Sequence, residues 1–372
     1  MKGGRIQGWG TGPLEPGVVK DGLIMDAPGL GSAVAGLLRP RARKGGRIIM
    51  ALNGLRITTR VLSFPRMRRS MYEEAIRREA KREMPLPEEE LCLSWQAIEP
   101  GEREQRFFVV GVARNLLQTQ IEALKQLGIS PRLMEPKAVA LARAVNRKEA
   151  LIMDLEPEGF EIILAVDGIP LVTHRGPWRQ GSTAPEDMVQ HLMHELSRAL
   201  KFYSSAYPDN HLDPETPAFL TGELAVDPAI SGLCRSKVGY TIEPLEPPLD
   251  CPPDLPLSEY AVNLGLALKE MTPARGMGRD RFPLSGLNVQ LVDSSRSRPR
   301  ILKESLAVAA IAGAVLLLVP VDQANSQFVS ETGRMRAEVA SAAEELNLRK
   351  IESKKAEAIS QALSETTAMV EG

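Results

Sequence analysis

The sequence predicts an α/β domain over residues 1–271, followed by one membrane-spanning helix and a short helical tail. Three observations indicate this. Strand-like and amphipathic helical segments alternate up to residue 271. The segment Ser305–Val321 contains seventeen residues and no charge, and residues 322–372 hold apolar residues at partly heptad spacing. We therefore expect three physically different parts in one chain.

In the first half of the domain, strand and helix signals alternate. The strands are expected at residues 4–10, 18–25, 47–52, 56–64, 91–99 and 106–113. The helices are expected at residues 30–38, 70–83, 115–127 and 136–146. For the second of these helices, Ser70 is the candidate N-cap, with Glu73 at the capping-box position.

The second half continues the alternation. An apolar strand at 150–155 precedes a hairpin of 161–166 and 169–174, which turns at Asp167-Gly168. The elements that follow are a helix at 186–203, a strand at 217–221, a helix at 227–233, a strand at 240–243 and a helix at 258–271. Six prolines between residues 244 and 257 predict an extended loop before the last helix.

The uncharged stretch Ser305–Val321 is at the lower end of the length that crosses a bilayer as a helix; a buried core helix is the alternative. Four basic residues precede it, and no Lys or Arg follows until Arg334; the four are Arg296, Arg298, Arg300 and Lys303. The positive-inside rule predicts a single-pass protein of the plasma (inner) membrane, with residues 1–300 in the cytoplasm and 322–372 outside. The start of the sequence holds no apolar signal-peptide core.

Composition argues against several function classes. The net charge is −1, which does not favour a nucleic-acid partner. Neither a Walker-type phosphate loop nor a G-x-S-x-G elbow occurs in the sequence. His191, His194 and Glu195 share one predicted helix, and the two histidines lie on one face of it and could hold a metal. Their spacing is not that of H-E-x-x-H and no third ligand is evident, so we expect no metal.

The order of motifs resembles PilM, the actin-like cytoplasmic protein of type IV pilus assembly. The motifs, in family order, are GPLEPGVVKDGLIMD, SFPRM, YEEAIRREAKREMPLP, LLQTQIEALKQLGISP, EPKAVALARA, HELSRALKFY and YAVNLGLALKEM. The resemblance covers about residues 10–271 and implies an actin-like (ribonuclease H-type) two-lobed domain. The α+β subdomain inserted into it would be roughly residues 56–128.

The segment after residue 286 resembles the start of PilN, the family's membrane partner. PilN has a short Asn-Leu-Leu peptide, one membrane helix and a coiled coil, and here Leu287, Asn288, Val289 and Leu291 occupy the peptide's place in a linker spanning 272–304. In the resembled system this peptide docks in a groove between the core and inserted subdomains. We therefore expect these residues to bind a partner, to dock on their own domain, or to dock on a neighbouring copy, and a plain linker is the alternative.

The same resemblance implies a degenerate nucleotide pocket. The family's first phosphate loop lies before the point at which this sequence begins. The second should read Asp-x-Gly, but here Asp154 is followed by Leu155, Glu156 and Pro157. The adenosine motif, normally a pair of glycines, reads Gly222-Glu223. A glycine lets backbone amides approach phosphate, whereas Glu156 adds negative charge and Pro157 removes a donor.

The sequence thus predicts a non-enzymatic, membrane-anchored scaffold without a cofactor. It would link cytoplasmic machinery to inner-membrane components of a type IV pilus, or of type II secretion, whose GspL has the same layout. Self-association through residues 287–291 or through the coiled coil of 322–372 is a further expectation. The alternative function is a nucleotide-switched actin-like ATPase that binds ATP.

Overall fold

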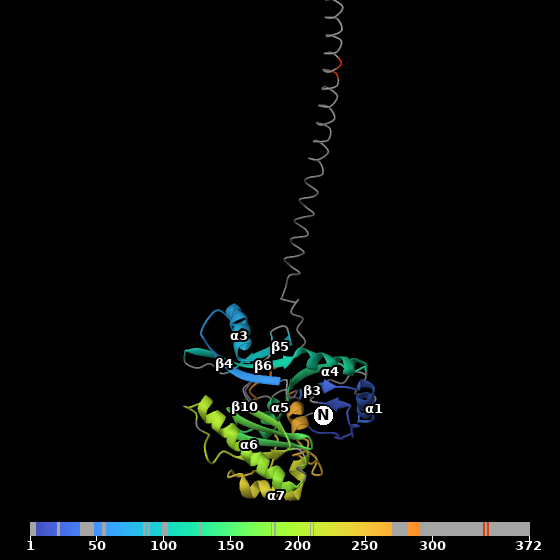
Figure 1. Ribbon diagram of the computed structural model, residues 1–372, viewed down its shortest axis with the longest axis vertical. Helices are drawn as coiled ribbons and strands as arrows, with labels where there is room; N and C mark the ends of the chain where they lie inside the picture. The colour runs from blue at the N-terminus through green and yellow to red at the C-terminus, as the bar shows by residue number, and fades with distance from the viewer. Residues whose placement is uncertain are drawn as a thin grey trace, which may run out of the picture. The chain divides into compact units, whose positions relative to one another are not determined.

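The computed structural model describes residues 5–290 with short gaps, together with Glu338 and Ser341. The gaps are 21–22, 38–47, 54–56, 85–86, 88–89, 99–102, 127, 180, 182–183, 209, 211 and 270–281. The chain divides into two units, Met1–Val292 and Asp293–Gly372, and the first of these contains all the named helices and strands. Figure 1 shows the described elements of this unit.

The membrane prediction falls outside the described residues, because Ser305–Val321 and the heptad positions of the tail are not among them. Across the described ranges, the structure contains no helix that is long and apolar enough to cross a bilayer. The span, its orientation and the coiled coil therefore stay predictions.

The larger sheet lies in the lower part of Figure 1 and has the strand order β10-β9-β8-β11. These strands are β8 (Glu149–Glu156), β9 (Gly159–Val166), β10 (Ile169–Pro177) and β11 (Ala218–Thr221). Helices α6 (Pro185–Ala206) and α7 (Pro228–Lys237) cover one face, and α5 (Lys137–Val145) and α8 (Ala261–Lys269) cover the other. Because both faces are covered, β8 is apolar almost without interruption, as is typical of a sandwiched strand.

A second sheet has the order β4-β6-β5, and its strands fall within residues 56–128, the range in which the inserted subdomain is expected. It consists of β4 (Ile57–Pro65), β5 (Leu91–Ala97) and β6 (Glu104–Ala113). Helix α3 (Arg69–Glu83) packs on one face through Ile76 and Ala80, and α4 (Arg114–Gln126) packs on the other through Leu116 and Leu117.

The remaining strands are short. β3 (Ile48–Leu52) and β7 (Pro131–Pro136) form a parallel pair, and β1 (Val19–Lys20) and β2 (Leu23–Ile24) form a small antiparallel pair. Helix α1 (Ala27–Leu37) contacts α4, and the 3-10 turn η2 (Glu223–Val226) follows β11. In sequence, β3 precedes the strands of the second sheet and β7 follows them, and β7 leads directly into α5.

Four local predictions were wrong. Residues 18–25 form two short strands rather than one. In place of a strand at 4–10, Arg5 makes an isolated bridge to Asp250. In place of a strand at 240–243, Ile242 makes an isolated bridge to Ala218. Ser70 does not cap α3; Arg68 has the extended cap conformation, with φ −62° and ψ 138°, and Ser70 lies inside the first turn. A hydroxyl caps a helix only from the residue that still has non-helical dihedral angles.

Candidate functional site

A row of polar side chains crosses the larger sheet on the face toward α5. Thr221 is the register partner of Asp154, Asp154 is that of Glu161, and Glu161 is that of Arg175. Residues directly opposite each other in a sheet point to the same face, so the four side chains form one line. Thr221 Oγ1 donates to Asp154 Oδ1 at 2.7 Å, and Arg175 Nη2 donates to Glu161 Oε1 at 2.7 Å.

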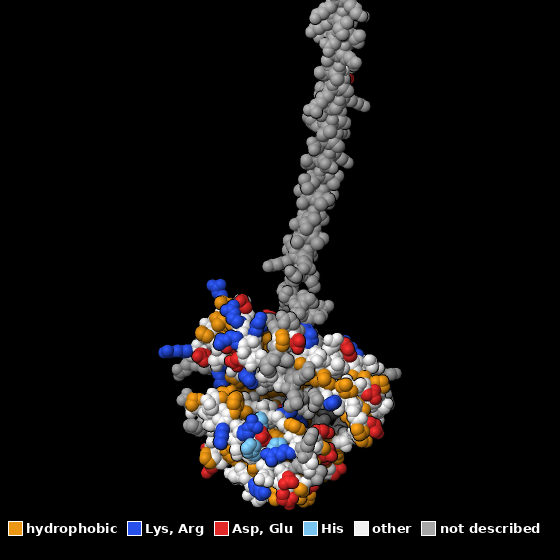
Figure 2. Space-filling view, in the orientation of Figure 1, with side chains coloured by type: hydrophobic (Ala, Val, Ile, Leu, Met, Phe, Trp, Pro, Cys, Tyr) orange, Lys and Arg blue, Asp and Glu red, His pale blue; other side chains and the backbone are white. Residues whose placement is uncertain are grey.

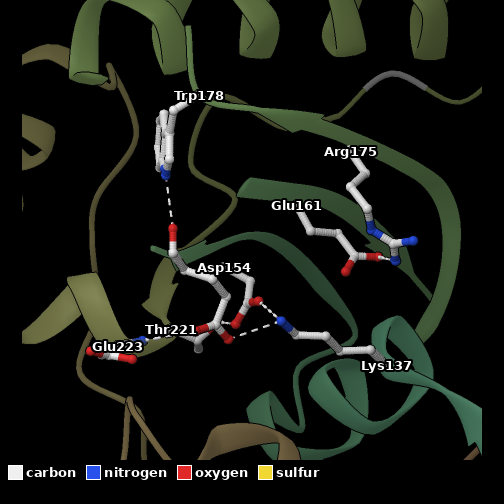
Figure 3. Close-up of polar contacts among 8 residues, drawn as sticks. Lys137, Asp154, Glu161, Arg175, Trp178, Thr221 and Glu223 are labelled. Carbon is white, nitrogen blue, oxygen red and sulfur yellow. Dashed lines mark hydrogen bonds and ion pairs between the residues drawn. The ribbon is translucent and has the colours of Figure 1, made fainter. Parts of the chain in front are cut away.

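Lys137, the first residue of α5, extends its ammonium group into this row (Figure 3). Its Nζ forms an ion pair with the Asp154 carboxylate and donates to Glu156 Oε1 at 3.0 Å. Burial alone would lower the pKa of Lys137, but the surrounding carboxylates of Asp154, Glu156 and Glu161 outweigh it and raise that pKa. The lysine is therefore held in its charged form.

The carboxylates respond in the opposite direction to burial. Burial is the main cause that raises the pKa of Glu156, the Asp154 charge raises it further, and Lys137 lowers it. Burial also raises the pKa of Glu161, against the opposing effects of Arg175 and Lys137. We conclude that the cluster contains negative charge that is costly to bury, offset mainly by Lys137 and Arg175.

The backbone around Glu156 is fixed by contacts with other elements. Glu156 Oε2 accepts from the backbone N–H of Glu223 at 3.4 Å, and Trp178 Nε1 donates to the Glu156 carbonyl at 2.8 Å. Gly222 has φ +91°, and a Cβ on it would lie 2.3 Å from the Leu155 carbonyl oxygen. The glycine is thus required by the close approach of two strand ends.

The structure brings together all four residues predicted for the degenerate pocket: Asp154, Glu156, Gly222 and Glu223. The sequence reasoning missed Lys137, Thr221, Glu161 and Arg175. A signal for Lys137 was present, because it is a cation at the first position of a helix whose next five residues are apolar. The Glu223 amide and the Lys137 ammonium, two groups suited to phosphate, are bonded to carboxylates instead.

The two histidines of the predicted helix face on α6 lie in different surroundings. His191 packs edge-on against the rings of Phe160 and Trp178, and the His194 side chain is exposed. His174, from β10, bonds Glu195 with its Nε2 at 2.6 Å from Oε2. Among the described residues, no group of three His, Cys, Asp or Glu side chains could hold a metal ion.

A second candidate site is formed by residues 284–289, which we call the docked segment. Leu284, Leu287 and Val289 are each at most 1% exposed. They belong to a cluster with buried side chains from β3, β6, β7 and α4, namely Leu52, Phe108, Val110, Leu116 and Met134. The segment therefore packs between the β3–β7 pair and the three-stranded sheet with its helix α4.

Hydrogen bonds with the backbone of β7 connect the β3–β7 pair to the docked segment. Met134 N–H donates to Asn288 Oδ1 at 3.0 Å, and Val289 N–H donates to the Met134 carbonyl at 2.8 Å. The Asn288 side chain thus takes the place of a strand carbonyl, a recognised way for a sheet edge to hold an extended peptide.

A buried charge cluster holds the segment from the other side. Lys269 Nζ, on α8, donates to the Leu287 carbonyl at 2.5 Å and to Glu135 Oε2 at 2.5 Å. Glu135 also accepts two bonds from Arg143 of α5, at 2.5 and 2.9 Å. The predicted residues Leu287, Asn288 and Val289 are therefore in contact with their own domain, whereas Leu291 lies outside the described residues.

Comparisons with known proteins bear on the fold. Neither a protein-family model nor a curated protein matches the sequence. Among solved structures, a chain of the PilM-PilN type IV pilus biogenesis complex is similar over 70% of this chain and 90% of that chain, at 23% identity and a TM-score of 0.58.

Two further solved structures are less similar. The cytoplasmic domain of EpsL, an inner-membrane component of the Vibrio cholerae type II secretion system, matches over 66% of this chain and 82% of its own, at 12% identity and a TM-score of 0.41. A Bacteroides thetaiotaomicron protein with an actin-like ATPase fold matches over 64% of this chain and 80% of its own, at 9% identity and a TM-score of 0.34. These two lower scores establish nothing by themselves. The likeness to the chain of the PilM-PilN complex carries the conclusion that residues of the first unit adopt a PilM-like fold.

Proposed function

We propose that this protein is a non-enzymatic scaffold of a type IV pilus assembly platform, or of the related type II secretion platform. The observation that carries the proposal is the docked segment. In the resembled system a partner's Asn-Leu-Leu peptide lies between the core and inserted subdomains, and here Leu287, Asn288 and Val289 lie between β7 and the β6–α4 layer. The similar solved structure is itself a complex of PilM with PilN.

In this proposal the docked segment shortens the connection between the domain and the predicted membrane span. An undocked chain from Lys269 to Ser305 could extend to about 120 Å, whereas the stretch from Val289 to Ser305 reaches only about 50 Å. The domain would thus be held close to the membrane, where it could join cytoplasmic machinery to inner-membrane components. A single chain would then contain both the domain and its anchor.

We further propose that the degenerate pocket binds no ATP. Its cation and its nearby amide already bond Asp154 and Glu156. A phosphate charge about 5 Å from the Glu156 carboxylate would be repelled by about 3 kcal/mol at an effective dielectric of about 20. Binding would also require the Lys137 pairs to break.

The competing function is a nucleotide-switched ATPase, and a thermal shift assay on the full-length chain separates the two. We expect the unfolding temperature to stay unchanged in millimolar Mg-ATP, because only a ligand that binds the folded state stabilises it. Saturable stabilisation by ATP, absent with the same concentration of phosphate, would favour the ATPase instead.

The scaffold role itself is tested in the native host. We expect deletion of the gene to abolish pili or type II secretion, and an affinity-tagged chain to co-purify inner-membrane assembly proteins. A Lys137→Arg variant, which keeps the cation in the pocket, is the control and should restore assembly. Normal pili and normal secretion in the deletion strain would refute the proposed function.

A further inference from the structure

A cavity of about 490 Å³ lies beside β10, and no residue of the docked segment lines it. Its volume is within the range of about 300–1,000 Å³ that is typical of ligand sites. It is lined by β4, β10 and α6, with Pro136, Ala138 and Glu161 between them. Figure 1 shows β4 and β10 as facing members of the two sheets.

The lining exposes the edges of two strands. Four consecutive residues of β4, Ile57–Arg60, and five consecutive residues of β10, Leu171–Arg175, contact the cavity. A strand that presents a face contributes every second residue, because successive side chains point to opposite faces. Consecutive lining residues therefore mean that the cavity meets the strand edges, where backbone N–H and C=O groups are available.

Both strands are at the ends of their sheets. β10 ends the order β10-β9-β8-β11, and β4 ends the order β4-β6-β5, so within the described residues no strand pairs with the outer edge of either. Thr173 Oγ1 lies buried on β10 and, across the part of the chain that the structure describes, has no hydrogen-bond partner. The backbone N–H and C=O groups of an edge strand are a template for another strand, so a bound strand would pair with these edges and not with the buried Thr173 hydroxyl.

The side chains around the cavity are basic and partly apolar. Arg60, Arg175 and Arg198 line it, whereas the lining contains one carboxylate, Glu161, which already bonds Arg175. Phe202 of α6 also lines it and is 57% exposed. Figure 2 shows Lys, Arg and His side chains gathered on the face of the α6 lobe that is in view.

We propose that this cavity binds an extended acidic peptide of a partner protein, which adds a strand to β10 or β4. Backbone bonds to the strand edge would give affinity, and alternating acidic and apolar side chains would reach the arginines and Phe202. Arg60 forms an ion pair with Glu83, and both side chains are well exposed. Arg198 is also well exposed, but its partner Glu195 is largely buried. Neither glutamate lines the cavity. A peptide carboxylate can compete for the Arg60–Glu83 pair, because an exposed ion pair contributes little stability. The proposal does not depend on the pilus or secretion role.

The test uses the full-length chain and fluorescein-labelled hexapeptides in fluorescence anisotropy. We expect a peptide that alternates glutamate and valine to bind saturably, and its lysine–valine counterpart to show no binding. A glutamate–valine peptide with alternate backbone amides N-methylated should lose binding, because it cannot pair with a strand edge. Equal binding of the lysine or the N-methylated peptide, or no binding of the unmodified acidic peptide, would overturn the proposal.

Charge reversal locates the site. Arg60→Glu should weaken the acidic peptide about tenfold, because a like charge replaces an attractive one in the cavity wall. The matched control is Arg78→Glu on α3, where the side chain is 75% exposed and lies outside the lining. Phe202→Ser, at an exposed position, provides a second variant without a buried substitution. The proposal is wrong if Arg60→Glu and Arg78→Glu have the same effect.

Discussion

Truncation of Leu287 should release the docked segment without unfolding the domain. Burial of Leu284, Leu287 and Val289 contributes about 1.5–3 kcal/mol each, or about 4.5–9 kcal/mol together. Three hydrogen bonds, two with the Met134 backbone and one from Lys269, add about 1 kcal/mol each. Ordering of six residues costs about 9 kcal/mol, at about 1.5 kcal/mol per residue.

These quantities offset one another, so docking is favoured by at most about 3 kcal/mol. Leu287→Ala removes most of one anchor, about 1.5–3 kcal/mol, and should shift the equilibrium toward the undocked state by about ten- to a hundredfold. Leu287 belongs to one hydrophobic cluster, the one around Phe108. The clusters on the larger sheet and the cluster under α3 do not contain it. The effect should therefore be local.

Hydrogen-exchange mass spectrometry measures this directly. In Leu287→Ala, the amides of residues 284–290 should exchange faster, by up to about a hundredfold where docking is worth about 3 kcal/mol, whereas β8 and β9 keep their protection. Gln290→Ala is the matched control, because Gln290 is in the same stretch and exposed. Unchanged exchange in Leu287→Ala would show that the packing energy was overestimated. Equal acceleration in β8 would show that the segment is part of the folding core.

Three further outcomes follow from the pocket and the sequence. Lys137→Met should destabilise the chain by about 3–5 kcal/mol in urea unfolding, since it leaves the buried Asp154 carboxylate without its cation, and an unchanged midpoint would contradict this. Because the pKa of Glu156 is raised in the folded state, the folded protein binds the proton of this carboxyl more tightly than the unfolded chain does. The stability that Glu156 contributes is therefore complete below about pH 4.5 and is lost as pH rises through the folded pKa. Glu156→Gln should gain stability relative to the natural chain across that rise, and parallel pH profiles of the two midpoints would show the sign to be wrong. For the predicted span, a reporter active only outside the cytoplasm should work when fused after Gly372 and be silent after Pro283, and the reverse pattern would refute the topology.

The sequence by itself determined the alternation of strands and helices and most of their places, because apolar periodicity and turn residues are local properties. It located Asp154, Glu156, Gly222 and Glu223 through the motifs, and it singled out Leu287, Asn288 and Val289. It misplaced the cap of α3, because a cap depends on dihedral angles that the residue types leave open.

Only the tertiary structure decided what these residues contact. Lys137 meets Asp154 because α5 begins over the end of β8, and Glu161 and Arg175 join them through strand register, which links positions far apart in sequence. The two open edges of β4 and β10 share one cavity because two sheets with a long stretch of chain between them meet there. Such contacts depend on packing between elements, which has no signature in the local pattern of residues.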